Sequence, residues 1–230
     1  MDAVAIVLAF IVVAAIIAVF AYLSHQQAKK RAAELRAWAA GRGLAFSEDR
    51  EYGLDEEFPD FSSLQRGSNR YAYNIARGGW GERSVLAFDY HYQTTSSDGK
   101  KIRTHHHYLS AAVLDCRMPL GRIEIRPENV LDRVAEFFGF DDIDFESVEF
   151  SRAFHVSAKD RKRAYDVVDQ RVMEYLLASP RRAISISGRF LCTSDGRTWS
   201  PEEMESAIVH LNGLVDRLAP SLVRELLEKG

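Results

Sequence analysis

Apolar and polar positions fall into three patterns along this chain, and the first is an unbroken apolar run near the N-terminus. Residues Ala3–Leu23 contain no charged residue, proline or glycine. A helix of this length extends about 31 Å, roughly the thickness of the hydrocarbon core of a bilayer. A cleaved signal peptide is the alternative, but Met1-Asp2 supplies no basic leader and the apolar run is too long. We therefore predict a transmembrane anchor over residues 1–24.

Alternation with a period of two follows in the first part of the remaining chain and predicts strands. These strands cover Arg70–Ala76, Ser84–Tyr92, Ile102–Leu114 and Arg122–Arg126, with a glycine-rich turn at Arg77–Gly81. Helical spacing predicts a helix over Gln26–Ala40 that continues from the anchor. It predicts a second helix that Pro127 opens and Gly139 closes.

The second half of the chain carries clearer start and stop signals. The pattern predicts a strand over Phe145–Val156, a helix from the cap at Ser157 to about Ala178, and a hairpin over Ala183–Thr193. Ser200-Pro201-Glu202-Glu203 combines an N-cap, a first-turn proline and a capping glutamate, so another helix begins there.

These elements predict an α+β fold. Short loops between successive strands favour a mainly antiparallel sheet, against which about three helices pack. The acidic stretch Glu48–Asp60 is broken by Gly53 and Pro59, which is typical of a linker or mobile cover. The predicted organisation is an anchor over residues 1–24, a juxtamembrane helix and acidic linker over residues 25–60, and one domain over residues 61–230.

Charge indicates how the protein is oriented. Lys29, Lys30 and Arg31 follow the anchor directly, and basic residues beside a span remain on the cytoplasmic side. We therefore expect a single-pass protein of the cell (inner) membrane, with its N-terminus outside and its domain in the cytoplasm. The two cysteines, Cys116 and Cys192, are then expected to be free thiols in a reducing compartment. The whole chain has a formal net charge of −3, and Ser47–Gly230, with 25 basic and 31 acidic residues, carries −6; this acidity of the domain argues against nucleic acid as a partner.

Several short motifs carry a resemblance to a known group of proteins. They are Phe88-Asp89-Tyr90-His91-Tyr92, Pro127-Glu128, Asp142-Ile143-Asp144-Phe145, the stretch Glu149–Val156, and Ser187-Gly188 with Leu191. With these motifs, residues 58–227 resemble an uncharacterised family of bacterial single-pass membrane-anchored proteins, a domain of unknown function. The resemblance implies a membrane-attached α+β domain and brings no activity and no catalytic residue.

Histidines offer the first candidate chemistry. His105-His106-His107 lies in a predicted strand, so alternation places His105 and His107 on one face and His106 on the other. If the preceding strand pairs with it, His91 comes close. His91, His105 and His107, with Asp89, would then form a binding site able to hold zinc, which takes three or four nitrogen or oxygen ligands. The alternative is that these residues make ordinary cross-strand contacts.

Other clusters admit both a functional and a structural interpretation. The acidic run Asp141, Asp142, Asp144 and Glu146 could bind calcium or magnesium, but it lacks the spacing of an EF-hand loop and fits a solvated corner. Cys116 with His155 could pair as nucleophile and base, although no catalytic signature surrounds either residue. Phe88, Tyr90 and Tyr92 share one strand face, which is either core or a partner-binding surface.

No catalytic residue is assigned from the sequence. The favoured function is a membrane-tethered cytoplasmic binding or scaffold domain that contacts the lipid bilayer through its N-terminal helix and a protein partner at the membrane, without a cofactor. The alternative is a metal-dependent hydrolase, with zinc, that uses the strand histidine cluster.

Overall fold

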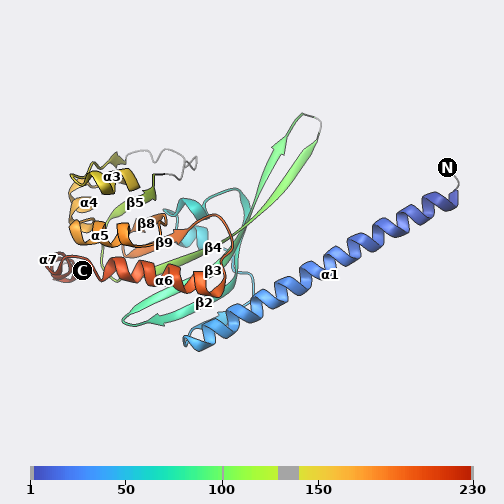
Figure 1. The fold of residues 1–230 in the computed structure, drawn as a ribbon, viewed down its shortest axis with the longest axis horizontal. Helices are drawn as coiled ribbons and strands as arrows, with labels where there is room; N and C mark the ends of the chain where they lie inside the picture. Colours follow the sequence, from blue (N-terminus) through green and yellow to red (C-terminus); the bar gives the residue numbers. More distant parts are fainter. Residues whose placement is uncertain (1–2, 100, 129–139, 229–230) are drawn as a thin grey trace.

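A computed structural model describes residues 3–99, 101–128 and 140–228 of the chain. Its first element, helix α1 (Ala3–Gly41), is continuous from the apolar run into the folded body. Figure 1 shows this helix extending far beyond the rest of the molecule. By length and composition it could cross a membrane. It ends where Gly43 adopts a φ of 68° and the Leu44 N–H donates to the Ala39 carbonyl at 2.9 Å, a glycine-terminated helix end.

The sheet confirms the predicted α+β class with antiparallel pairing. Its nine strands run in the order β1-β2-β3-β4-β9-β8-β5-β7-β6, and every described pair of neighbours is antiparallel. The strands are β1 (Ala45–Ser47), β2 (Ser68–Trp80), β3 (Arg83–Ser97), β4 (Ile102–Asp115), β5 (Arg122–Pro127), β6 (Asp141–Asp142), β7 (Phe154–Ala158), β8 (Ile184–Ser187) and β9 (Phe190–Ser194).

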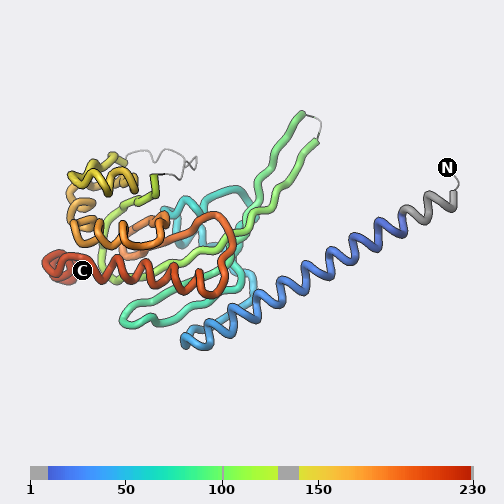
Figure 2. The backbone as a smooth tube through the Cα atoms, viewed as in Figure 1, coloured from blue at the N-terminus to red at the C-terminus, as the bar shows by residue number. Residues whose placement is uncertain are grey.

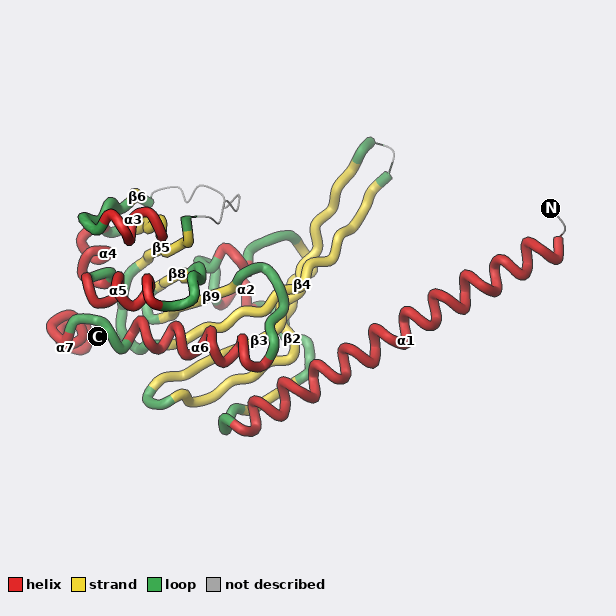
Figure 3. The backbone as a smooth tube through the Cα atoms, viewed as in Figure 1, coloured by secondary structure: helices red, strands yellow, loops and turns green. Residues whose placement is uncertain are grey.

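Helices and a loop segment cover the two faces of the sheet (Figure 3). The helices are α3 (Val148–Ala153), α4 (Arg161–Val167), α5 (Gln170–Ala178), α6 (Pro201–Val215) and α7 (Pro220–Glu228). One sheet face carries Ala87 and Ala112 and packs under α6 and the C-terminal end of α1; we call it the helix face. The opposite face carries Phe88 and Tyr90 and packs under a short segment; we call it the loop face.

The segment over the loop face begins in the acidic stretch Glu48–Asp60, which was predicted to be a linker or mobile cover, and continues to Leu64. It contains α2 (Leu54–Glu57) and the 3-10 helix η1 (Ser62–Leu64). Leu54, Phe58 and Leu64 are buried against the sheet. Glu56 and Glu57, between Leu54 and Phe58, are exposed, so the stretch is amphipathic and belongs to the folded body. Tyr90 donates its hydroxyl hydrogen to the Leu64 carbonyl at 2.9 Å, which places the aromatic strand face in the core.

Three local predictions differ from the structure. The expected strand over Phe145–Val156 begins instead as α3, because the Ser147 side chain accepts from the Phe150 N–H and caps a helix. The single helix expected up to Ala178 is instead two helices, α4 and α5, because the Asp169 side chain caps the N-terminus of α5. β2 continues through the glycine-rich stretch to Trp80. The helix predicted between Pro127 and Gly139 lies largely outside the described residues.

Two other predictions are confirmed. The hairpin of β8 and β9 turns at Gly188, and Ser200 with Glu203 forms a reciprocal capping box at the start of α6.

Candidate functional site

Helix α1 is joined to the sheet by a buried ion pair between Arg31 and Asp89. Asp89 lies on the helix face of β3 and is fully buried. The Arg31 Nε–H donates to Asp89 Oδ2 at 2.8 Å, and its Nη2–H donates to Oδ1 at 2.6 Å. Such a two-pronged contact fixes orientation as well as charge. The pair therefore fixes α1 in both position and rotation against the sheet.

Neighbouring strands satisfy the remaining hydrogen-bonding capacity of Asp89. The Asn74 side-chain amide donates to Oδ2 at 2.9 Å, and the Ser110 hydroxyl donates to Oδ1 at 2.6 Å. Asn74 has a φ of 50° and sits where the register of β2 shifts, which turns its side chain toward the carboxylate. Ser110 also accepts from the Trp199 N–H at 2.9 Å. We call Arg31, Asp89, Asn74 and Ser110 together the junction.

Asp89 and Arg31 thus have different surroundings from those the sequence suggested. Asp89 was a candidate zinc ligand, and the structure places it under α1 with an arginine. Arg31 was predicted to orient the protein together with Lys29 and Lys30; both lysines are exposed on α1, while Arg31 pairs with the buried carboxylate.

The predicted histidine site does not assemble as a group. His91 is buried, its Nε2 lies 3.0 Å from Nδ1 of His106, and its Nδ1 lies 3.1 Å from the Asn69 carbonyl oxygen. Cross-strand register pairs Tyr92 with His107 and Thr94 with His105, so His105 and His107 occupy the opposite sheet face. There, His107 contacts the Thr94 hydroxyl at 2.8 Å and His105 contacts the Ser96 hydroxyl at 3.3 Å.

This arrangement corrects the proposed ligand set. Asp89 and His91 face one side of the sheet, and His105 and His107 face the other. Within the described residues, no group of three or more histidines, cysteines or acidic residues gathers closely enough to hold a metal ion. His155 lies 3.1 Å from an oxygen of Asp142 in the acidic run, and the Cys116 thiol donates to the Met118 carbonyl at 3.4 Å.

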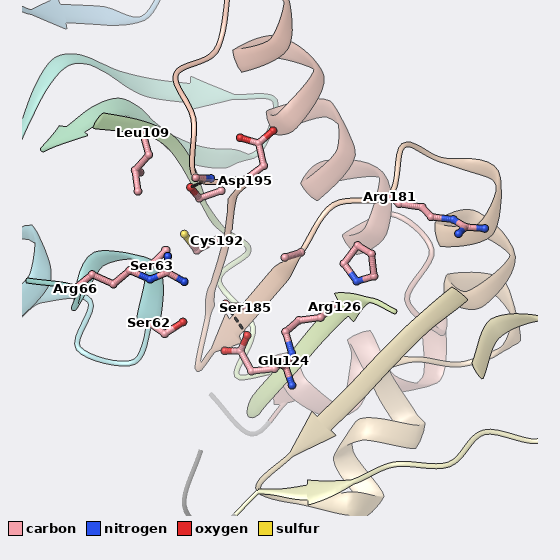
Figure 4. A pocket seen from close by; sticks show the side chains of 14 residues that line it. Ser62, Ser63, Arg66, Leu109, Glu124, Arg126, Arg181, Ser185, Cys192 and Asp195 are labelled. Atoms are coloured by element: carbon pink, nitrogen blue, oxygen red, sulfur yellow. Dashed lines mark hydrogen bonds between the residues drawn. The ribbon is translucent and has the colours of Figure 1, made fainter. Parts of the chain in front are cut away.

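A pocket on the loop face is a candidate site that no sequence motif indicated. Its cavity measures about 150 Å³ and lies where the segment bearing η1 meets β5, β8 and β9 (Figure 4). The lining combines hydroxyls, one thiol and charges of both signs, contributed by stretches up to 134 positions apart. Its most distinctive members are Ser62, Glu124, Arg126, Ser185 and Cys192. No local sequence motif indicates such a site, because its residues come together only when the chain folds.

Glu124 is the unusual group in this pocket. It is buried, and desolvation raises its pKa to about 7, although the hydrogen bond from Ser185 at 2.7 Å and the charge of Arg126 act in the opposite direction. The buried Nε–H of Arg126 has no hydrogen-bond partner among the described residues. The pocket thus contains a carboxyl that changes protonation near neutral pH and an arginine with spare donor capacity, which suits a small polar or anionic ligand.

The pocket thiol is unsuited to nucleophilic chemistry. Cys192 is buried, and desolvation raises its pKa to about 12. A nucleophilic cysteine needs its thiolate form, so Cys192 is inert at neutral pH. The lining therefore favours binding.

Glu124→Gln is expected to change how stability depends on pH. The folded pKa of about 7 lies above the ordinary value of 4.5, so the wild-type domain loses stability as pH rises through this window. Glutamine has no such titration. The stability difference between the variant and wild type should therefore shift by about 3 kcal/mol in favour of the variant between pH 4.5 and pH 8. Urea denaturation at several pH values measures it.

The exposed Glu149→Gln serves as the control for that experiment, because its carboxyl is solvated on α3. A Glu124 variant whose stability difference stays flat across the pH range would show that the buried carboxyl ionises as it does in water.

Comparison with known proteins shows what fold this is. No protein-family model and no curated protein matches the chain. The structure is similar to the crystal structure of the mycobacterial trehalose monomycolate transport factor A, TtfA. The TM-score is 0.61 at 10% sequence identity, and the match covers 80% of this chain and 92% of that one. The two proteins share an architecture, and at this identity the likeness concerns the fold alone.

Proposed function

We propose that this protein is a membrane-tethered binding domain that serves as an accessory factor at a membrane. The junction is the observation that carries the proposal. A flexible tether would need no buried contact, whereas here Arg31, eight residues beyond the apolar run, is bonded to a buried carboxylate on β3, an interior strand of the sheet. The helix and the domain thus form one rigid unit, which suits a protein that presents a site at a set height and angle above a bilayer.

The pocket supplies the binding part of this proposal. It has a buried carboxyl, an arginine with spare donors and several hydroxyls, and its thiol is inert. The fold it shares with TtfA, whose name gives it a part in trehalose monomycolate transport, is consistent with an accessory role at a membrane. The basic residues Lys29 and Lys30 beside the span favour a cytoplasmic domain and an outward N-terminus.

The alternative, a metal-dependent hydrolase, is less well supported. The Asp89 carboxylate forms an ion pair with Arg31, and His91 lies on the opposite sheet face from His105 and His107. A metal site built on these residues would require the strand register to change.

Site-specific photo-crosslinking in cells tests the proposal. Benzoylphenylalanine at Arg181, on the exposed rim of the pocket, should give a discrete adduct in the membrane fraction. The same probe at Val209, which is 51% exposed on α6, should give none. Arg126→Ala should remove the adduct at Arg181 if the pocket holds the ligand. A protein found in the soluble fraction, or equal adducts at the two positions, would refute the proposal.

A further inference from the structure

The long hairpin of β3 and β4 extends beyond the folded body as a two-stranded arm. Pairing continues as far as Ser97 opposite Ile102, yet the side chains from Thr94 to Gly99 and from Lys101 to His106 are exposed. We call residues 94–99 and 101–106 the arm. Figure 2 shows its two strands standing clear of the other elements. A two-stranded hairpin with no further packing is marginally stable in water, so contact with another surface would stabilise the arm.

The lengths of the arm and of the membrane helix can be compared from one point, the contact between Arg31 and Asp89. Arg31 of α1 and Asp89 of β3 are in direct contact. From Arg31, the helix reaches the end of the apolar run at Leu23 in eight residues, about 12 Å. From Asp89, β3 reaches Ser97 in eight residues, about 26 Å at the rise of a strand.

Both elements leave the body on the same side (Figure 1). The length from Asp89 to the end of β3 at Ser97 is about twice the length from Arg31 to Leu23, so β3 is long enough to bring the end of the arm to the surface of a bilayer that α1 spans. The junction holds α1 at a fixed angle, so this reach follows from the fold.

The end of the arm has the composition of a surface that meets lipid headgroups. Lys101 and Arg103 are exposed there, and Ile102 between them is 76% exposed. Asp98 is the single acidic residue between Thr94 and His107, in a chain whose overall net charge is negative. Cations beside an apolar side chain suit a membrane interface, where the charges meet anionic headgroups and the apolar group enters the boundary layer.

We propose that the end of the arm binds the anionic lipid surface of the leaflet that faces the domain. Lys101 and Arg103 contact the headgroups, and Ile102 enters the interface. The arm and α1 then give the domain two attachment points, which restrict its rotation above the bilayer. This inference rests on the proposed membrane tether and on the proposed cytoplasmic orientation, which places the domain at an anionic leaflet.

A fluorophore at the end of the arm tests the proposal in the full chain. Ile102→Cys is labelled with the environment-sensitive dye NBD, since Cys116 and Cys192 are buried. The protein is placed in nanodiscs of phosphatidylcholine alone or with phosphatidylglycerol. The emission of NBD should shift to the blue and intensify in the anionic nanodiscs, and added salt should reverse the change. The same dye on Val209→Cys, on α6, should not respond.

Charge removal then identifies the residues responsible. Lys101→Gln with Arg103→Gln should lower the ratio of bound to free arm about 25-fold, at roughly fivefold per cation near an anionic surface. Lys159→Gln with Lys162→Gln, an exposed pair at the α4 end of the body, changes net charge equally and should leave the ratio unchanged.

The possible outcomes distinguish the proposed lipid binding by the arm from the proposed membrane tether. A chain that does not enter nanodiscs at all contradicts the proposed tether. A chain that enters them while the dye at position 102 stays in water, or responds equally in both lipid compositions, overturns the proposed binding of anionic lipid by the arm.

Discussion

Arg31→Met is expected to lower the free energy of unfolding of the domain by about 3–5 kcal/mol, because it leaves the buried carboxylate of Asp89 without its cation. Methionine retains much of the apolar stem of arginine, so little packing is lost with the charge. The hydrogen bonds from Asn74 and Ser110 remain but do not neutralise the charge. Urea denaturation of the full chain in detergent, followed by tryptophan fluorescence, measures the change.

Arg77→Met provides the matched control. Arg77 forms an ion pair with Glu51 in which both side chains are largely solvent-exposed, so its loss should cost less than about 1 kcal/mol. The double variant Arg31→Met with Asp89→Asn removes both charges and should recover part of the loss. Equal effects of Arg31→Met and Arg77→Met would show that the junction is not an energetic centre of the fold.

Trp199→Ala is expected to cost a similar amount, about 3–5 kcal/mol, through the loss of a large buried side chain. Trp199 is fully buried between the sheet and the start of α6. Its indole N–H donates to Asp195 at 2.6 Å, and the Arg182 guanidinium lies 5.1 Å from its ring centroid. Thermal unfolding and denaturant titration both report the loss.

Trp199→Phe separates packing from hydrogen bonding at this position. Phenylalanine fills most of the volume but cannot donate to Asp195, so about 1 kcal/mol of the loss should reflect the hydrogen bond. Because Asp195 also lines the pocket, this variant should also loosen the pocket wall. If the alanine and phenylalanine variants are equally unstable, the hydrogen bond and not the packing dominates.

The histidines show how a correct local prediction can give a wrong site. Alternation correctly places His105 and His107 on one face and His106 on the other. Which of these faces His91 shares depends on the cross-strand register, and that register is set by the long pairing of β3 with β4. It brings His91 beside His106. A shift of one residue would have reversed the result.

Features that depend on neighbouring residues could be predicted from the sequence. An uninterrupted apolar run, period-two alternation and the capping signals at Ser200 act over a few positions, and they predicted the N-terminal helix, the antiparallel α+β class and the start of α6. Such signals work because solvent exposure and backbone hydrogen bonding repeat with the period of each element.

Contacts between distant parts of the chain could be identified only from the folded structure. Arg31 and Asp89 lie 58 positions apart, and each resembles an ordinary surface charge in sequence. The pocket draws Ser62, Glu124 and Cys192 from separate segments, and Glu124 acquires its raised pKa only when the fold removes water around it. Buried ion pairs, cavities and shifted pKa values arise from register and packing between remote segments, which no local period encodes.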